Sequence, residues 1–207
     1  CIRDSLNAIG MGLQRLRIEA DELDADAQEL IATMRRALKR VDGIVENIRM
    51  YAHPLQPRRQ PIFFGDLVRD VWVLYQQRCI DQHIRANIDI HADSPLFGDP
   101  DLLSQATENL INNSIEAQPD GGFLSLQVSI REGECVFRVE NGGFTLPSSE
   151  ADQILEPYYT TKTRGTGLGL AIVRKTLLAH GGRLAVSVPR PGVLRVTLRL
   201  PLRPDTR

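Results

Sequence analysis

The chain has 207 residues, a hydrophobic content of 42% and a formal net charge of −1. This length exceeds the commonest size of one domain, so we expect two units or one domain with an appendage. The balanced charge argues against binding to nucleic acid or to an anionic membrane surface, and no apolar run approaches the length that spans a bilayer.

Cysteine usage and the first residue bear on the cellular context. The three cysteines, Cys1, Cys79 and Cys135, are odd in number, far apart and without metal-site spacing, which favours a reducing cytoplasm. No methionine precedes Cys1, so we expect a fragment of a longer protein, and membrane attachment of that parent stays open. We expect no membrane contact by the fragment itself.

Residues 1–54 predict a helical hairpin. Apolar residues recur at alternating intervals of four and three in two stripes, which the polar stretch 19–24 separates. The stripes are Ile2, Leu6, Ile9, Leu13 and Leu16, and then Leu30, Met34, Leu38, Val41, Val45 and Ile48. Two helices alone bury too little apolar surface, so we predict a homodimer through residues 1–54, in which two hairpins form a four-helix bundle. The same periodicity also fits a coiled-coil spacer or adaptor.

A linker is expected over residues 55–62, because proline cannot donate a hydrogen bond inside a helix and restricts the residue before it. The prolines that end the helical pattern are Pro54, Pro57 and Pro61. A second unit is expected over residues 63–203, beginning with a helix from about Asp66 to Cys79. The predicted apolar face of that helix comprises Leu67, Val71, Leu74 and Tyr75.

The rest of the second unit alternates strands and helices. Strand patterns cover residues 84–90, 123–129, 135–140, 184–188 and 193–200. Gly98-Asp99-Pro100-Asp101 caps a helix that carries several asparagines, and residues 168–178 form another helix. This order predicts one helix layer on a mixed sheet, an α/β sandwich with the other sheet face open, so the whole chain is of the α+β class.

The segment from Glu156 to Val173 carries the strongest functional signal. Gly165, Gly167 and Gly169 are spaced by two and run directly into an apolar helix. Glycines let the backbone approach a ligand closely. A helix that begins there directs free N–H groups and the positive end of its dipole at an anion. The segment therefore predicts a phosphate site.

Two upstream segments extend this site. Asn109 and Asn113 lie four residues apart on one helix face, although helix interiors disfavour asparagine. Asn141-Gly142-Gly143 follows a strand and offers a polar side chain beside a flexible turn. Taken singly, the two asparagines also fit exposed or capping positions, and the turn fits an ordinary loop. The order of the three segments argues for one composite site.

The segments in this order resemble the successive asparagine, first glycine, phenylalanine and second glycine boxes of sensor histidine kinases. The matching stretches are Asn109–Asn113, Val139–Gly143, Glu156–Lys162 and Gly165–Leu170. These kinases share an ATP-binding fold with gyrase, the heat-shock chaperone ATPases and the MutL repair proteins. The resemblance covers roughly residues 60–202 and implies ATP and Mg²⁺ as ligands.

The resemblance also implies roles for single residues. Asn141 matches the aspartate that accepts a hydrogen bond from the adenine amino group, and an uncharged amide predicts weaker affinity. Gly143 matches the first glycine of that turn, whereas Thr145 replaces the second. Asn113 matches the magnesium-binding asparagine, an oxygen ligand suited to a hard cation. Asn109 stands where related ATPases carry a water-activating glutamate, so its amide favours phosphoryl transfer over hydrolysis.

The lid and glycine segments supply further candidates. Lys162 and Arg164 either neutralise charge on the transferred phosphoryl group or are solvated lid residues, and both interpretations stand. The Thr166 hydroxyl either donates to phosphate or caps a turn. Tyr158 and Tyr159 are expected to pack the lid against the helices. The resemblance assigns nucleotide contacts to Thr166, Gly167, Leu168, Gly169 and Leu170.

Residues Ile2 to Ile9 resemble the stretch that follows the phosphoacceptor histidine in kinase dimerization helices. In that register the histidine precedes Cys1, and Cys1 itself occupies the place of the acidic residue thought to act as base. Either the fragment begins one residue too late, or the parent has a degenerate acceptor site.

These observations favour the core of a two-component sensor histidine kinase. It would phosphorylate a histidine expected just before Cys1 and pass the phosphoryl group to an aspartate on a response regulator receiver domain. The alternative is a pseudokinase or regulatory module with weak or no nucleotide binding, which Asn141, Thr145 and Cys1 keep open. An ATPase of the gyrase or chaperone type is disfavoured because Asn109 is not a glutamate.

Overall fold

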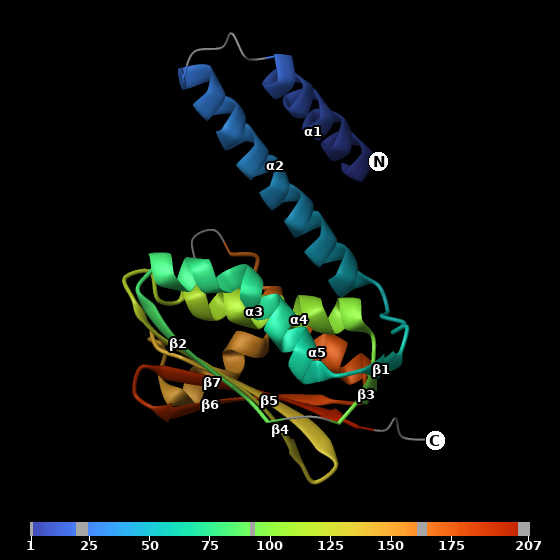
Figure 1. Ribbon diagram of the computed structural model, residues 1–207, viewed down its shortest axis with the longest axis vertical. Coiled ribbons are helices and arrows are strands. Elements are labelled where there is room, and N and C mark those ends of the chain that lie inside the picture. The colour runs from blue at the N-terminus through green and yellow to red at the C-terminus, as the bar shows by residue number, and fades with distance from the viewer. Residues whose placement is uncertain (1, 20–24, 92–93, 161–164, 203–207) are drawn as a thin grey trace. The chain divides into compact units, whose positions relative to one another are not determined.

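A computed structural model describes residues 2–19, 25–91, 94–160 and 165–202. The chain divides into two compact units, residues Cys1–His53 and Pro54–Arg207. Figure 1 shows a pair of helices in the first unit and a layer of helices on a sheet in the second. The α+β class and the helical N-terminal segment predicted from the sequence are confirmed.

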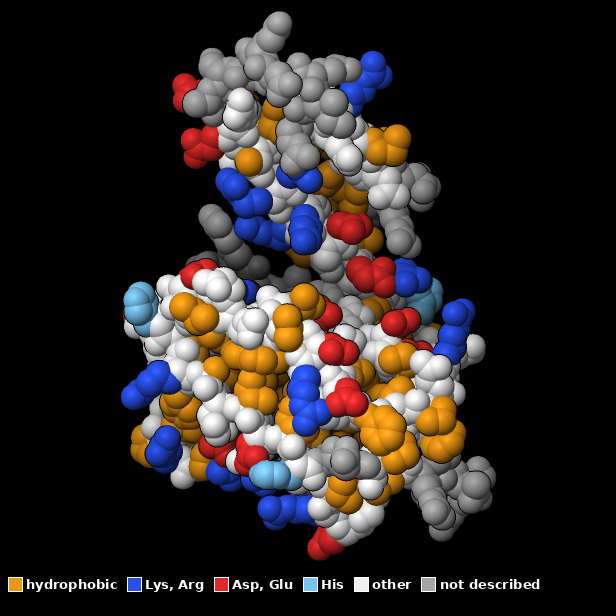
Figure 2. All heavy atoms as spheres, viewed as in Figure 1, with side chains coloured by type: hydrophobic (Ala, Val, Ile, Leu, Met, Phe, Trp, Pro, Cys, Tyr) orange, Lys and Arg blue, Asp and Glu red, His pale blue; other side chains and the backbone are white. Residues whose placement is uncertain are grey.

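The first unit is a hairpin of helix α1 (Ile2–Glu19) and helix α2 (Ala25–Ala52). The helices approach closely at Gly10, where an added β-carbon would lie 3.2 Å from a methyl carbon of Leu38. Leu13 and Ile31 are buried, with exposed fractions of 8% and 9%. Many side chains of the predicted apolar stripes have exposed fractions of 43–56%. They are Ile9, Leu16, Leu30, Met34, Val41 and Ile48. Hydrophobic side chains accordingly reach the surface of this unit among charged ones (Figure 2).

The second unit contains a five-stranded mixed sheet in the order β2-β4-β5-β7-β6 and a two-stranded antiparallel sheet of β1 and β3. Only the β2–β4 pair of the larger sheet is parallel. The strands are β1 (Gln60–Ile62), β2 (Ile84–Ile90), β3 (Leu96–Gly98), β4 (Gly122–Arg131), β5 (Glu134–Asn141), β6 (Arg183–Arg190) and β7 (Val193–Pro201). The helices are α3 (Phe64–Asp81), α4 (Pro100–Glu116), the 3-10 helix η2 (Ser148–Leu155) and α5 (Gly169–Ala179).

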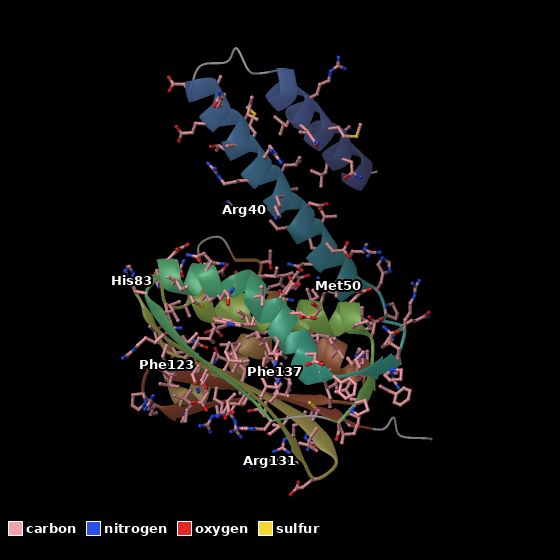
Figure 3. All side chains as sticks on the ribbon, viewed as in Figure 1. Arg40, Met50, His83, Phe123, Arg131 and Phe137 are labelled. Carbon is pink, nitrogen blue, oxygen red and sulfur yellow. The ribbon has the colours of Figure 1, made fainter. Side chains whose placement is uncertain are left out.

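The two faces of the large sheet differ in chemistry because strand residues alternate between faces. One face packs under α3, α4 and α5, and Phe137 lies there between strands and helices (Figures 1 and 3). The opposite face carries cross-strand ion pairs, Arg195 with Glu140 at 2.6 Å and Arg183 with Glu134 at 2.6 Å. Because these charged pairs cover one face of the sheet, only the other face needs a layer of helices, as the sequence predicted.

Helix α3 corrects one prediction about its apolar face. The helix buries Phe64, Val68, Val71 and Cys79, whereas Leu74, expected in the core, is 71% exposed. The edge-to-face contact of Phe64 with Phe137, 5.6 Å between ring centroids, sets the rotation of the helix. Of the other predicted face residues, Val71 is buried and Leu67 and Tyr75 pack partly buried against the core, so the predicted face is wrong only at Leu74. The helix also begins two residues before the predicted Asp66.

The short strand β1 places residues 60–62, part of the expected linker, inside the second unit. It pairs with β3 from Gln60–Gly98 to Ile62–Leu96. Neither strand was predicted, because three residues give too short a pattern for alternation to be recognised. The cysteines at 79 and 135 are buried and free.

Helix α4 begins at a buried polar cluster. Asp99 is its N-cap, and Oδ1 of Asp99 accepts hydrogen bonds from the backbone N–H groups of Asp101 and Leu102. Its Oδ2 accepts from the backbone N–H of Arg58 at 2.8 Å. The Asp99 N–H donates to Nε2 of buried His180 at 2.9 Å, and Nδ1–H of His180 donates to the carbonyl of Thr176 at 2.7 Å. These two bonds require the neutral imidazole.

Acidification is expected to weaken the second unit through His180. Burial lowers the pKa of His180 below its ordinary value of about 6.5, and the nearby charge of Arg59 lowers it further. The unfolded chain therefore takes up this proton at a higher pH than the folded chain does. The contribution to stability is complete above the unfolded pKa and is lost as the pH falls towards the folded pKa.

We expect the urea midpoint of wild-type protein to fall between about pH 7 and pH 5, and that of the neutral variant His180→Gln to fall less over the same range. His180→Ala, which leaves the buried Asp99 N–H without its acceptor, should cost about 1–3 kcal/mol at pH 7.5. Equal pH slopes in wild type and His180→Gln would contradict the role of His180.

Candidate nucleotide site

The site is built where β5, α4 and α5 meet. Asn141, the last residue of β5, pairs in register with Leu124 of β4 and Leu194 of β7 and is only 2% exposed. Its side-chain Nδ2 donates to the carbonyl of Gly142 at 2.6 Å. The amide oxygen is therefore the atom left to accept a hydrogen bond from a ligand.

Asn109 and Asn113 lie one turn apart on α4 and face the first residue of α5. A β-carbon added to Gly169 would lie 3.2 Å from Nδ2 of Asn113 and 3.9 Å from Oδ1 of Asn109. Nδ2 of Asn109 is buried and has no hydrogen-bond partner among the described residues. A buried donor without an acceptor lowers the free energy of unfolding, so this amide is suited to donate a hydrogen bond to a bound ligand.

The turn before α5 depends on glycine at position 167. Gly167 has φ of +65°, and an added β-carbon would lie 2.4 Å from the backbone carbonyl carbon of Tyr158. The backbone N–H of Tyr158 donates to the carbonyl of Gly167 at 3.0 Å, which closes the loop onto the helix start. Leu168 follows, is 1% exposed and anchors the helix in the core, while Leu170 is partly buried against it.

The structure tests some of the sequence-based expectations for Thr166 and the lid residues. Oγ1 of Thr166 accepts a hydrogen bond from the backbone N–H of Leu168 at 3.3 Å, which matches the turn-capping interpretation. Tyr158 is 65% exposed, so the expectation that it packs the lid against the helices is wrong for this residue. Its backbone, with φ of +67°, is what contacts the glycine turn. Lys162 and Arg164 lie outside the described residues.

The turn after Asn141 is packed against the end of α4. Gly143 has φ of +76°, and an added β-carbon would lie 2.1 Å from the carbonyl oxygen of Ala117. Oε1 of Gln118 accepts from the backbone N–H of Gly142 at 3.1 Å. Sequence analysis missed Gln118, because a glutamine just past a helix end is ordinarily a solvated residue. The only sequence feature that could have pointed to a structural role for Gln118 was its position before the Pro119–Gly122 turn.

The donor set suits a nucleotide with a hard cation. Amide oxygens of asparagine are typical Mg²⁺ ligands, and the open N-terminus of α5 offers backbone N–H groups to phosphate. Within the described ranges, no group of three or more His, Cys, Asp or Glu side chains forms a metal cluster. A cation here would thus be held by amide oxygens together with its own water and the phosphates.

The comparisons with known proteins agree with this geometry. Residues 98–204 match the family model described as histidine kinase-, DNA gyrase B-, and HSP90-like ATPase. The chain belongs to this family. It is 28% identical to the sensor histidine kinase ZraS of Escherichia coli (strain K12) over 202 residues, covering 97% of this chain and 43% of ZraS. The chain thus spans less than half the length of that relative.

Solved structures support the same assignment. The catalytic domain of the histidine kinase ThkA superposes with a TM-score of 0.65 at 27% identity, covering 72% of this chain and 99% of that domain. ThkA in complex with the response regulator protein TrrA gives a TM-score of 0.73 at 24% identity, covering all of this chain and 60% of the ThkA chain, which supports the fold. The sequence-based identification as a sensor histidine kinase core is confirmed.

Among the described residues, no helix has the length and apolar character needed to traverse a bilayer.

Gly167→Ala is expected to lower stability and nucleotide binding more than Gly133→Ala does. Gly133, in the β4–β5 turn, also has positive φ (+77°) but no atom within 4 Å of an added β-carbon, so Gly133→Ala bears only the backbone strain of about 1–2 kcal/mol. Gly167→Ala adds a clash with backbone atoms of Tyr158. We expect a lower urea midpoint for Gly167→Ala than for Gly133→Ala, with loss of nucleotide binding in Gly167→Ala alone. Equal behaviour of the two variants would show that the close contact is unimportant.

Proposed function

We propose that this chain phosphorylates a histidine immediately before Cys1 and passes the phosphoryl group to a response regulator. The coarser statement, that the chain is a histidine kinase catalytic core with an ATP-binding domain, rests on the family match. The observation that carries the finer proposal is the convergence of Asn109 and Asn113 on Gly169 at the start of α5. Residues 1–54 serve as the dimerization hairpin, 55–62 as linker and 63–203 as the catalytic domain.

Each site residue has a distinct task in this proposal. The oxygen of Asn141 accepts from the adenine amino group, and Gly143 lets that turn approach the base. The oxygen of Asn113 binds Mg²⁺, which when bound offsets phosphate charge. Asn109 is uncharged and cannot abstract a proton from water, so transfer is favoured over hydrolysis.

The phosphate end of the nucleotide is assigned to the turn before α5. Backbone N–H groups of Gly167, Gly169 and Leu170 lie at a helix N-terminus, where they favour an anion, whereas the N–H of Leu168 donates to Oγ1 of Thr166. The hydroxyl oxygen of Thr166 caps this turn by accepting from the Leu168 N–H, and its O–H is assigned to phosphate in this proposal. Lys162 and Arg164 supply positive charge from the lid in this proposal.

Incubation with radiolabelled ATP and Mg²⁺ tests the proposal. The parent protein, including the residue before Cys1, should incorporate acid-labile and base-stable label. Asn113→Ala should lower Mg²⁺-dependent ATP affinity by about 10- to 100-fold, the range typical of disturbed metal sites. Its neighbour Asn112 instead accepts from Arg78 and donates to Glu116 on the surface, so Asn112→Ala is a matched control. Absence of both label and nucleotide binding would refute the kinase.

The exposed stripes of α1 and α2 support a homodimer. Apolar side chains at Leu30, Met34, Val41 and Ile48 are 43–56% exposed in one chain, so burying the exposed half of each is worth roughly 1 kcal/mol, about half the value for a fully exposed side chain. Association of two hairpins would cover them. We propose that a response regulator receiver domain docks on this bundle; the structural neighbour ThkA is itself found in complex with the response regulator protein TrrA.

Sedimentation tests the dimer. Val41→Glu places a charge in the exposed stripe and should shift the protein to a monomer, because a buried unpaired carboxylate is costly. Lys39→Glu introduces the same side chain two residues away at an exposed position and should leave the dimer intact. Identical masses for the two variants would contradict an interface on this stripe.

A regulatory module with weak or no nucleotide binding is the second candidate. The features that favour it are Asn141 in place of an aspartate, Thr145 in place of a glycine, and Cys1 in place of an acidic residue. The binding measurement above separates it from the kinase.

A further inference from the structure

Gln118 joins three parts of the second unit through one buried side chain. It lies just past the end of α4 and is only 3% exposed. Its Nε2 donates to the carbonyl of Ser114 at 3.0 Å, which holds the side chain against the last turn of the helix. Its Oε1 accepts from the backbone N–H of Phe123 at 2.9 Å, at the start of β4, and from that of Gly142 at 3.1 Å.

The backbone around Gln118 leaves no room for another arrangement. An added β-carbon at Gly122 would lie 2.0 Å from Oε1 of Gln118, and one at Gly142 would lie 2.9 Å from the same atom. Both neighbours must therefore be glycine for the amide oxygen to reach the two N–H groups. A solvated glutamine at a helix end would impose no such requirement.

The contacts of Gln118 continue to Asn141. Gly142 gives its N–H to Gln118, and its carbonyl accepts from Nδ2 of Asn141 at 2.6 Å. Only the nitrogen end of an amide can donate to a carbonyl, so this bond turns the Asn141 oxygen away from Gly142. A flipped amide would place two oxygens against each other and lose the bond.

We propose that Gln118 is a positioning residue that holds the backbone of Gly142 at its N–H and, through the carbonyl of the same residue, the orientation of the Asn141 amide, so that the site selects adenine over guanine. The proposal rests on the proposed nucleotide-binding function. An aspartate has only acceptor oxygens at this position, whereas an asparagine offers a donor to the 6-carbonyl of guanine as readily as an acceptor to the 6-amino group of adenine. The relay from Ser114 through Gln118 and Gly142 removes that ambiguity.

The substitution Gln118→Met tests the proposal, since methionine has similar length and no amide. In titrations of the whole chain with Mg²⁺ and either ATP or GTP, we expect wild type to prefer ATP. Gln118→Met should weaken ATP binding about tenfold or more, because the Phe123 N–H loses its side-chain acceptor and the Gly142 N–H keeps only its 3.4 Å bond to the Phe123 carbonyl. The ratio of ATP to GTP affinity should fall at least about fivefold, because the Asn141 amide is then free to turn.

Two comparisons separate positioning from general stability. Gln118→Glu keeps an oxygen for Gly142 and Phe123 but loses the donor to Ser114, so it should lower the urea midpoint and preserve the ATP preference. Val68→Ala, on the buried face of α3, should also lower the midpoint while leaving the ATP-to-GTP ratio unchanged. Amide hydrogen exchange at Gly142 and Phe123, measured without nucleotide, should speed up in Gln118→Met and not in Val68→Ala.

The outcomes are distinct. If wild type binds ATP and Gln118→Met retains the wild-type ATP-to-GTP ratio, the positioning role is overturned and the proposed function stands. Unchanged exchange at Gly142 in Gln118→Met likewise overturns it. If wild type binds neither nucleotide, the proposed function and the role of Gln118 in base selection both fail.

Discussion

Helix α4 is fixed at both ends by buried polar contacts, and the geometry of the candidate site depends on this constraint. At its start, Asp99 caps the helix while His180 and Arg58 fix Asp99 from other elements. Just past its end, Gln118 binds the first residues of β4 and the turn after β5. Asn109 and Asn113 lie between these anchors. Their distance from Asn141 and from α5 is therefore set by contacts at the two ends rather than by the asparagines themselves.

The candidate site uses amides at positions where a carboxylate is the simpler choice. A carboxylate accepts only, so its orientation matters little, whereas an amide is useful to a ligand in one of two orientations. Asn141 has the nitrogen end of its amide engaged with backbone, which leaves the oxygen end for a ligand, whereas Gln118 has both ends engaged with backbone. Asn109 differs, because its nitrogen is buried without a partner in the described part of the chain. The cost of that unpaired donor is consistent with a site that is completed by its ligand.

The two units are stabilised in different ways. The second unit buries its own core between one helix layer and one sheet face, and covers the other face with ion pairs such as Arg195 with Glu140. The first unit leaves much of its apolar stripe exposed, as Val41 and Ile48 illustrate. In the proposed homodimer this stripe is the interface, so the stability of the first unit would depend on protein concentration.

Sequence alone determined the large strands, the hairpin, the capped start of α4 and the glycine-started helix α5, because alternation, heptad spacing and capping residues are local properties. It also singled out Asn109, Asn113, Asn141 and the glycine turn, which carry recognisable residue types at recognisable spacings. Only the tertiary structure decided what distant contacts control: the rotation of α3 set by Phe64 against Phe137, and the pairing of β1 with β3. Gln118 belongs to the same group, since its role depends on two glycines, Gly122 and Gly142, that local patterns cannot connect to it, whereas packing places its amide oxygen against both of them.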